Sequence, residues 1–221
     1  PVPAVPTSPA AIASAMLLYG MALLYGVTGT TMLSEISASL QANGEQYRAL
    51  LVLAMVLLIA GFGFKMAVVP FQMWVPDVYQ GAPTPVAAFL SVGSKAAAFA
   101  VVTRIFFEGL GADFLSDDWS MIFAIIAAVS MTLGNLMAVV QTDIKRMLGY
   151  SSVAQAGTFL IGLAAISVPG ERFDLGGSGI LLFTASYAFT NLGAFVAIIA
   201  ISQKIGSDQI RDYAGMWKRS P

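Results

Sequence analysis

Long runs of apolar residues, separated by short polar connections, make up most of the chain. A helix needs about 20 mostly apolar residues to cross the hydrocarbon core of a bilayer. The runs are continuous and do not alternate between apolar and polar positions, so they are typical of helices and not of barrel strands. The pattern predicts an all-α polytopic membrane protein, with a single membrane domain over residues 1–221 and six transmembrane helices at residues 9–27, 49–75, 84–107, 119–140, 147–168 and 179–202.

Composition supports a membrane location and excludes several kinds of chemistry. Hydrophobic residues make up 57% of the chain and charged residues only 10%, whereas soluble domains carry about 25% charged residues. The net charge of −1 argues against nucleic acid as a partner, which would require clustered basic residues. The chain has no cysteine and no histidine, so thiolate metal sites, iron–sulfur clusters and a histidine general base are excluded within it. We therefore expect no redox or hydrolytic centre in this chain.

The two ends of the sequence indicate a piece of a longer protein. The chain opens with PVPAVPTSP, which has neither an initiator methionine nor the basic region of a signal peptide. Prolines at positions 1, 3, 6 and 9 are typical of an extended segment. We expect the six spans to be part of a larger membrane protein.

Charged residues lie almost entirely in the connections and divide unequally between the two sides of the membrane. Because six spans alternate in direction, each connection can be assigned to the side of the N-terminus or to the opposite side. The opposite side carries Arg48 and Arg172, with Arg104 close to its boundary, and most of the acidic residues. Basic residues cluster on the N-terminal side: Lys145, Arg146, Lys204, Arg211, Lys218 and Arg219. By the positive-inside rule, the N-terminal side is predicted to be cytoplasmic, or to face the matrix or stroma in an organelle.

Lys65 and Lys95 lie within predicted spans, where a charge is costly. Lys65 is about 24 Å along the second span at the helical rise per residue, and Lys95 is close to the middle of the third. A lysine near the midplane costs at least about 2.5–3.5 kcal/mol unless it faces a polar or hydrated interior. If the lysines only join helices through ion pairs, each needs a carboxylate partner. No acidic residue lies well inside a span of this chain. We favour the alternative that both take up and release protons. Arg104, at the end of its span, is expected to be an interfacial anchor.

Pro70 predicts an interruption of the second span. Proline removes one backbone hydrogen bond, and its ring clashes with the carbonyl four residues before it, here that of Met66. Interrupted helices at membrane depth mark ion pathways in transporters, although a simple proline kink is also common. The nearby Lys65 favours a discontinuous helix on a proton pathway. Candidates for lining this pathway are Pro70, Gln72, Ser91, Ser94 and Gln155; the alternative for the polar ones is a hydrogen bond between helices.

Two segments carry a resemblance to a known family. FKMAVVPFQMWVPDVYQGAPTPVAAFLSVGSKAAAFAVVTRIF, residues 64–106, and GNLMAVVQTDIKRMLGYSSVAQAG, residues 134–157, resemble the antiporter-like membrane subunits of respiratory complex I, NADH–quinone oxidoreductase. The match is nearest to the subunit N group, called subunit 2 in mitochondria, and runs from about Ala15 to the end of the chain. The PDVYQGAPTPV and QTDIKRMLGYSS blocks are its most specific parts.

This resemblance implies an antiporter-like inverted-repeat fold with a discontinuous helix at Pro70. It also implies proton translocation by Lys65 and Lys95, coupled to electron transfer from NADH to quinone. The family's essential glutamate and terminal lysine lie on helices outside this chain, so a complete proton path is not expected within it. Gln72 stands where the family often has histidine, and Gln155 where some members have one. A glutamine cannot take up a proton near neutral pH.

The resemblance further implies that this chain holds no cofactor, because FMN, the iron–sulfur clusters and quinone belong to other subunits. The expected partners are the other membrane-arm subunits of complex I and the lipid bilayer, without direct NADH binding. The expected location is the cell inner membrane, with the N-terminal side in the cytoplasm. Three alternatives stay open: a subunit of a multi-subunit cation/proton antiporter, a subunit of the photosynthetic relative of complex I, and a structural anchor whose lysines serve only assembly.

Overall fold

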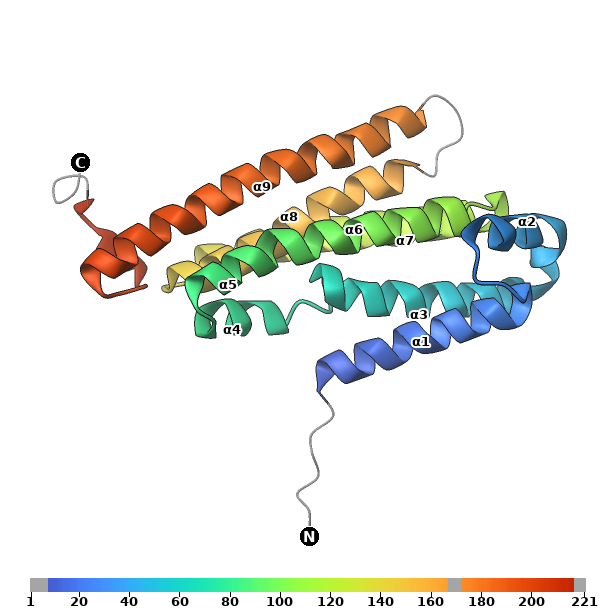
Figure 1. Cartoon of the computed structure of the whole chain (residues 1–221), viewed down its shortest axis with the longest axis horizontal. Coiled ribbons are helices and arrows are strands. Elements are labelled where there is room, and N and C mark those ends of the chain that lie inside the picture. The colour runs from blue at the N-terminus through green and yellow to red at the C-terminus, as the bar shows by residue number, and fades with distance from the viewer. Residues whose placement is uncertain (1–7, 167–171, 217–221) are drawn as a thin grey trace, which may run out of the picture.

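Long helices that run back and forth make up the fold, shown in Figure 1. The computed structural model describes residues 8–166 and 172–216. Short helical turns join the helices: the 3-10 turns η1 (Gly44–Tyr47) and η4 (Ile210–Tyr213), and the π-helical turns η2 (Leu90–Ser94) and η3 (Ile105–Gly109). The helices are α1 (Pro9–Thr28), α2 (Leu33–Asn43), α3 (Arg48–Met66), α4 (Trp74–Gly81), α5 (Thr84–Phe89), α6 (Lys95–Arg104), α7 (Asp113–Val139), α8 (Ile144–Ile166) and α9 (Arg172–Ile205).

Six segments of the described chain are long and apolar enough to cross a membrane. They are Pro9–Thr28, Leu33–Met66, Thr84–Gly109, Asp113–Val139, Ile144–Ala165 and Gly176–Ile205. The predicted all-α polytopic fold is therefore confirmed. Some predictions fall outside the described residues, namely the side chains of Arg172, Lys218 and Arg219 and the last two residues of the span 147–168.

Much of the connection between the first two predicted spans is helical. Residues 33–47 form α2 and η1 and lead directly into α3. Polar residues dominate this stretch, but Ile36 and Leu40 are four residues apart on one helix face, and both are buried in the core. Amphipathic spacing of this kind needs few apolar residues. The helix α7 begins at Asp113, before the predicted span 119–140, and Leu115 and Ser116 near its start are buried. Asp118 pairs with Arg48 at 3.1 Å.

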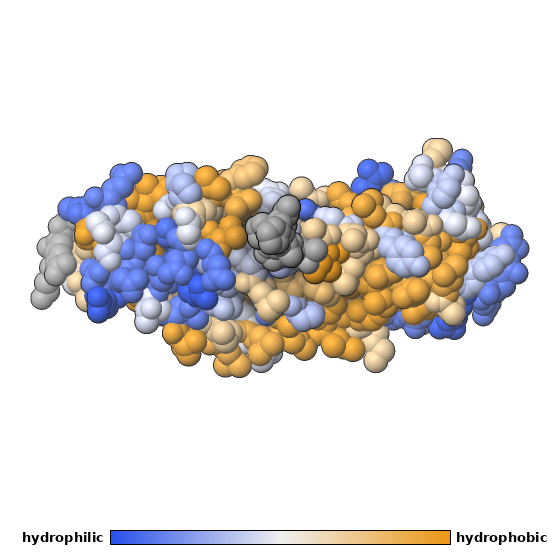
Figure 2. All heavy atoms as spheres, turned by 90° about the horizontal axis from the view of Figure 1, so that it is seen from below, coloured by the Kyte–Doolittle hydropathy of each residue, from blue (hydrophilic) through white to orange (hydrophobic). Residues whose placement is uncertain are grey.

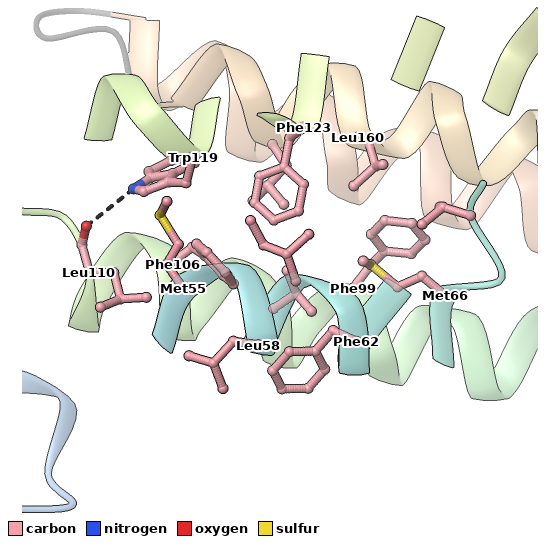
Figure 3. Close-up of a cluster of buried hydrophobic side chains, with 14 of the residues drawn as sticks. Met55, Leu58, Phe62, Met66, Phe99, Phe106, Leu110, Trp119, Phe123 and Leu160 are labelled. Carbon is pink, nitrogen blue, oxygen red and sulfur yellow. Dashed lines mark hydrogen bonds between the residues drawn. The ribbon is translucent and has the colours of Figure 1, made fainter. Parts of the chain in front are cut away.

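Aromatic side chains fill the centre of the core (Figure 3). Phe106 lies edge-on to Trp119 and Phe123, with ring centroids 5.8 and 4.9 Å apart. Edge-to-face pairs of this geometry add to the stabilisation that comes from burying the rings. The indole N–H of Trp119 donates to the carbonyl of Leu110 at 3.1 Å. The start of α7 is thereby fixed against the end of the third span.

Two glycines allow α7 and α8 to approach closely. A Cβ atom on Gly134 would lie 2.6 Å from the backbone nitrogen of Ala154, and one on Gly157 would lie 2.8 Å from the carbonyl oxygen of Ala127. Small residues at such positions let the backbones of membrane helices pack tightly.

The surface is apolar along the middle of the molecule and polar at its two ends. Figure 2 shows this for one face, on which hydrophobic residues lie between hydrophilic ones gathered at either end. Large side chains exposed on the described surface include Met121, Leu181, Leu182 and Phe189. A band of this kind is what a bilayer core would cover.

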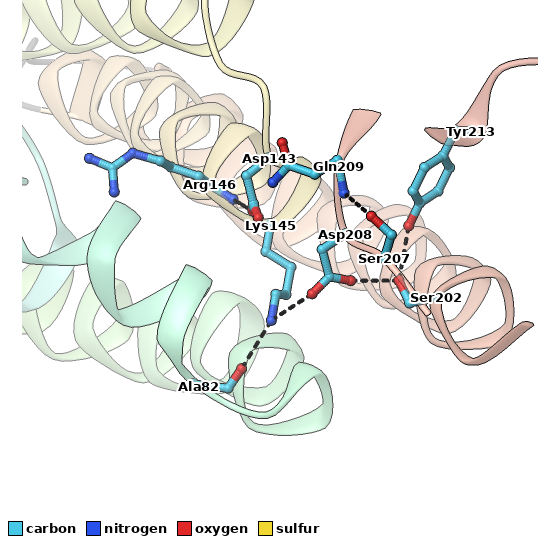
Figure 4. A network of polar contacts seen from close by, with 9 residues as sticks. All are labelled: Ala82, Asp143, Lys145, Arg146, Ser202, Ser207, Asp208, Gln209 and Tyr213. Atoms are coloured by element: carbon cyan, nitrogen blue, oxygen red, sulfur yellow. Dashed lines mark hydrogen bonds and ion pairs between the residues drawn. The ribbon is translucent and has the colours of Figure 1, made fainter. Parts of the chain in front are cut away.

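A polar network at one end joins α8, the connection between α4 and α5, and the segment that follows α9 (Figure 4). Lys145 forms an ion pair with Asp208 at 3.0 Å and donates to the carbonyl of Ala82 at 3.5 Å. Ser202 donates to Asp208 at 2.6 Å. Burial by itself would raise the pKa of Asp208, but the hydrogen bonds from Ser202 and Lys145 and the lysine charge outweigh it, so the pKa lies below its ordinary value.

A second ion pair at the same end holds α4. Arg146 pairs with Asp77 at 2.5 Å and donates to the side chain of Gln80 at 3.0 Å. The carboxylate of Asp143 accepts the backbone N–H of Arg146 at 3.0 Å, which satisfies a free donor in the first turn of α8. The second half of α4 is thus placed relative to α8.

Candidate functional site

The second predicted span is broken near Pro70, as expected, but the break begins earlier than the proline. Within the segment predicted as the second span, 49–75, α3 ends at Met66 and α4 begins at Trp74. Ala67 adopts the left-handed conformation with φ 62°. Its N–H donates to the carbonyl of Phe64, and the next N–H donates to that of Gly63. This is a Schellman motif, which ends a helix, here without the usual glycine.

Side chains from outside the break satisfy backbone groups that it frees. The indole N–H of Trp74 donates to the carbonyl of Phe64 at 3.0 Å, at the end of α3. The hydroxyl of Ser130 on α7 accepts the N–H of Val69 at 3.0 Å. Non-helical backbone at membrane depth is tolerated where protein groups or water pair with it. Residues 67–73 therefore have a defined place between α3 and α7.

Lys65 lies at the edge of this break. It is the penultimate residue of α3, and its side chain is exposed. It contributes to the wall of a recess of about 620 Å³ between the start of α1, the end of α3, α4 and α6, called here the Lys65 recess. Phe62, Trp74 and Ser94 also line it. Among the lining residues in the described part of the chain, Lys65 is the single charged one.

Lys95 is in a different environment, because its side chain is only 3% exposed. It is the first residue of α6, and its ammonium donates a hydrogen bond to the main-chain carbonyl of Ser152 on α8. Within the described residues no carboxylate pairs with it. A buried ammonium without a counter-charge is costly in an apolar interior, so Lys95 is the strongest candidate for a functional ionisable group here.

A π-helical turn, Leu90–Ser94, immediately precedes Lys95. Such turns are rare and occur frequently at functional sites. Ser91 is fully buried; its hydroxyl donates to the carbonyl of Ala88 at 2.7 Å and accepts from the amide of Asn191 on α9 at 2.6 Å. Ser94 donates to the carbonyl of Leu90 at 2.6 Å and lines the Lys65 recess. The two predicted serines therefore lie in different surroundings. Ser91 is part of a buried hydrogen-bond network, and Ser94 lines the Lys65 recess.

Four residues of the buried network were not predicted from the sequence. They are Tyr79, Ser152, Tyr187 and Asn191. The hydroxyls of Tyr79 and Tyr187 each lie 3.3 Å from that of Ser152, and the amide of Asn191 donates to the hydroxyl of Tyr187 at 3.3 Å. Tyr187 and Asn191 are four residues apart and so share a helix face, which was the one signal in the sequence that could have indicated them.

The other predicted residues lie apart from this network. Pro70 is exposed in the unwound segment. Gln72 is half-buried, and its side-chain carbonyl oxygen has no hydrogen-bond partner in the described structure. Gln155 is half-buried on α8, one turn beyond Ser152. Arg104 is exposed and pairs with Glu108 at 3.1 Å, as an interfacial anchor would.

Comparisons with known proteins show the family of this chain. A transmembrane family described as NADH:quinone oxidoreductase/Mrp antiporter matches residues 8–221. The chain belongs to this family. One relative in it, the NADH-quinone oxidoreductase subunit N of Desulforamulus reducens, is 46% identical over 212 residues, which are 96% of this chain. The chain spans 42% of that relative's length.

Two solved structures contain chains with the same fold. In respiratory complex I from Thermus thermophilus with bound aureothin, one chain is 35% identical with a TM-score of 0.72; the match covers 96% of this chain and 43% of the other. In the Mrp complex of a Dietzia species, one chain is 26% identical with a TM-score of 0.73, covering 89% and 34%. The predicted family and fold are confirmed, while the roles of Lys65 and Lys95 stay predictions.

Proposed function

We propose that the chain is a proton-translocating part of the membrane arm of an NADH–quinone oxidoreductase, in a subunit of the N type. In this role it couples electron transfer from NADH to quinone, carried out elsewhere, to proton movement through buried lysines. Membership of the antiporter family and 46% identity to a subunit N support the assignment. The observation that carries it is Lys95, a buried ammonium held by one carbonyl and by no carboxylate of the described chain.

Lys65 is proposed to exchange its proton with a carboxylate supplied by a part of the protein outside this chain. The Lys65 recess is open, and no acidic residue of the described chain lines it. A carboxylate beside Lys65 would favour the charged lysine, and its withdrawal would favour release of the proton. Lys95 would then pass a proton along the hydrated middle of the membrane. Pro70, Gln72, Ser91, Ser94 and Gln155 are proposed to line this path.

The proposed location is the cell inner membrane, and the proposed cofactors and redox centres lie in other subunits. FMN, iron–sulfur clusters and quinone are assigned to other subunits of the complex, and this chain is proposed to bind neither NADH nor any cofactor. The other membrane-arm subunits and the bilayer are its proposed partners. We place the N-terminal side in the cytoplasm and the protein in the cell inner membrane. The basic residues Lys145, Arg146, Lys204 and Arg211 near the start of α8 and the end of α9 support this orientation.

The direct test replaces each lysine in the full-length subunit within its assembled complex. Lys65→Ala and Lys95→Ala should each lower the number of protons moved per NADH oxidised, measured in proteoliposomes. Lys204→Ala, at the end of α9, is the matched control and should pump normally. Unchanged pumping by a correctly assembled Lys65 or Lys95 variant would remove that lysine from the mechanism.

A cation/proton antiporter is the second candidate, because the Mrp structure has the same fold. Purification of the native complex separates the two functions: flavin and iron–sulfur subunits should co-purify with the protein. Their absence, together with sodium-dependent proton exchange in vesicles, would favour the antiporter. The photosynthetic relative of complex I is distinguished by its electron donor, which binds other subunits. A purely structural anchor predicts that neutral variants of Lys95 fail to assemble.

A further inference from the structure

Ser152 on α8 is the residue at which four elements meet. Its side chain is 1% exposed. Its main-chain carbonyl accepts the hydrogen bond of Lys95, and its hydroxyl contacts Tyr79 on α4 and Tyr187 on α9. Partners 57, 73 and 35 positions away in the sequence thus converge on one serine.

The contact with Lys95 restricts the direction in which a proton can leave. A lysine ammonium has three N–H donors and no acceptor. One of these N–H groups binds the carbonyl of Ser152, which accepts a hydrogen bond but does not take up the proton. The proton must leave through one of the other two N–H bonds, and their directions are constrained once the first is held. The carbonyl of Ser152 therefore orients the ammonium.

Tyr187 and Asn191 link Ser152 to the π-helical turn that precedes Lys95. Asn191 donates both to the hydroxyl of Tyr187 and to that of Ser91. Ser91 lies in the π-helical turn that leads into Lys95. The contacts thus run from Lys95 to Ser152, then to Tyr187 and Asn191 on α9, and from there to Ser91, one turn before Lys95. Buried polar networks whose members are paired in this way rigidify their surroundings.

Tyr79 connects this network to the second half of the broken helix. No helical hydrogen-bond ladder fixes α4 relative to α3, because residues 67–73 between them are not helical. The hydroxyl of Tyr79, which is 1% exposed, is a buried polar contact between α4 and Ser152. A displacement of α4 would withdraw this hydroxyl from Ser152, the residue whose main-chain carbonyl holds Lys95.

We propose that Ser152, Tyr79 and Tyr187 are positioning residues for Lys95, which make proton transfer from its ammonium depend on the position of α4. The ammonium gives its proton to an adjoining water molecule and becomes a neutral amine. The three residues donate nothing to this step. Ser152 holds the lysine through its main-chain carbonyl, and the two tyrosines hold Ser152 through its hydroxyl. The inference rests on the proposed function, because it requires Lys95 to transfer protons.

The test removes one hydroxyl at a time from the full-length subunit in its assembled complex. Ser152→Ala, Tyr79→Phe and Tyr187→Phe should each slow NADH-driven proton uptake into proteoliposomes by about five- to ten-fold, the scale set by one buried hydrogen bond. The three variants should also shift the pH dependence of the proton-uptake rate. Matched controls on the exposed side of α1 are Ser14→Ala and Tyr19→Phe, which should pump as the unaltered complex does.

Two further variants separate positioning from a structural role. Ser152→Thr keeps the hydroxyl and should restore most of the pumping that Ser152→Ala loses. The double variant Tyr79→Phe/Ser152→Ala should be no slower than Ser152→Ala, because both changes break the same contact. Additive losses, an unshifted pH profile, or poor assembly of the hydroxyl variants would overturn the inference.

Lys95→Met distinguishes failure of this inference from failure of the proposed function. If Lys95→Met stops pumping while all three hydroxyl variants pump normally, the positioning role is wrong and the proposed function stands. If Lys95→Met pumps normally, the proposed function of Lys95 is wrong, and the inference falls with it.

Discussion

Lys145 at the start of α8 and Asp208, beyond the end of α9, form an ion pair at 3.0 Å. Lys145 is buried and also donates to the carbonyl of Ala82, which immediately follows α4. The backbone reinforces the pair, because the N–H of Ile144 donates to the carbonyl of Asp208 at 2.9 Å. This pair therefore fastens the segment after α9 to the end of the bundle that contains α4.

Removing the charge of Asp208 should destabilise this end of the molecule. Asp208→Asn leaves the buried ammonium of Lys145 without its counter-charge, which we expect to cost about 1–3 kcal/mol of unfolding free energy. Thermal unfolding of the detergent-solubilised full-length protein at pH 7 measures the effect. Asp117→Asn, on an exposed residue near the start of α7, is the control and should unfold as the unaltered protein does. Equal midpoints for the two variants would show that the pair contributes nothing.

The same pair predicts a dependence of stability on pH. The pKa of Asp208 is lowered in the folded protein, so the folded state binds its proton less tightly than the unfolded state does. The stability that Asp208 contributes is therefore fully present above its unfolded pKa of about 3.9 and is lost as the pH falls through the lower folded pKa. We expect the unfolding midpoint to drop more steeply below pH 4 in the unaltered protein than in Asp208→Asn. Parallel curves for the two proteins would contradict this.

Close packing of α7 on α8 should be sensitive to a single methyl group. In Gly134→Ala the new Cβ would meet the backbone of Ala154, which cannot rotate away. We expect a loss of about 1–3 kcal/mol, as for other overpacked sites, and a lower unfolding midpoint in detergent. Gly193→Ala on α9 is the matched control, since a Cβ there meets no atom within 4 Å. A Gly134→Ala protein as stable as Gly193→Ala would mean that the helices separate at little cost.

Replacement of Lys95 by an apolar side chain of similar length should separate stability from function. Lys95→Met keeps most of the buried volume and removes an ammonium that has no carboxylate partner in the described chain. We expect an unfolding midpoint equal to or above that of the unaltered protein, because well-packed apolar replacements of buried charges are often neutral or stabilising. Proton pumping should nevertheless be lost. A marked loss of stability would instead favour an anchoring role for Lys95.

The fold was largely predictable, because its main signal is local. Apolar runs of sufficient length predict membrane helices from composition alone, and Pro70 indicated the interruption through its missing N–H. The start of the interruption was not predictable in the same way. It is set by Ala67, whose left-handed conformation no residue preference indicates, and by the Trp74 and Ser130 side chains that pair with the freed backbone.

The residues of the candidate site also differ in whether the sequence could indicate them. Lys65 and Lys95 could be identified from the sequence because a charge inside an apolar run is costly wherever the chain folds. Tyr79 and Ser152 could not, since serine and tyrosine are common in membrane helices and mostly serve packing. Their importance comes from contacts across 73 and 57 positions of the chain.

By itself, the sequence determined that this protein is an all-α, multi-pass membrane protein, that one helix is interrupted near Pro70, and that two lysines lie within its apolar segments. Only the tertiary structure decided which of those lysines is buried, and it placed Lys95 on the carbonyl of Ser152 and Lys65 in an open recess. The physical reason is the range of the forces. Apolar spans and helix breaks depend on residues that are neighbours in the sequence. A hydrogen bond instead requires two groups within about 3 Å, whatever their distance along the chain.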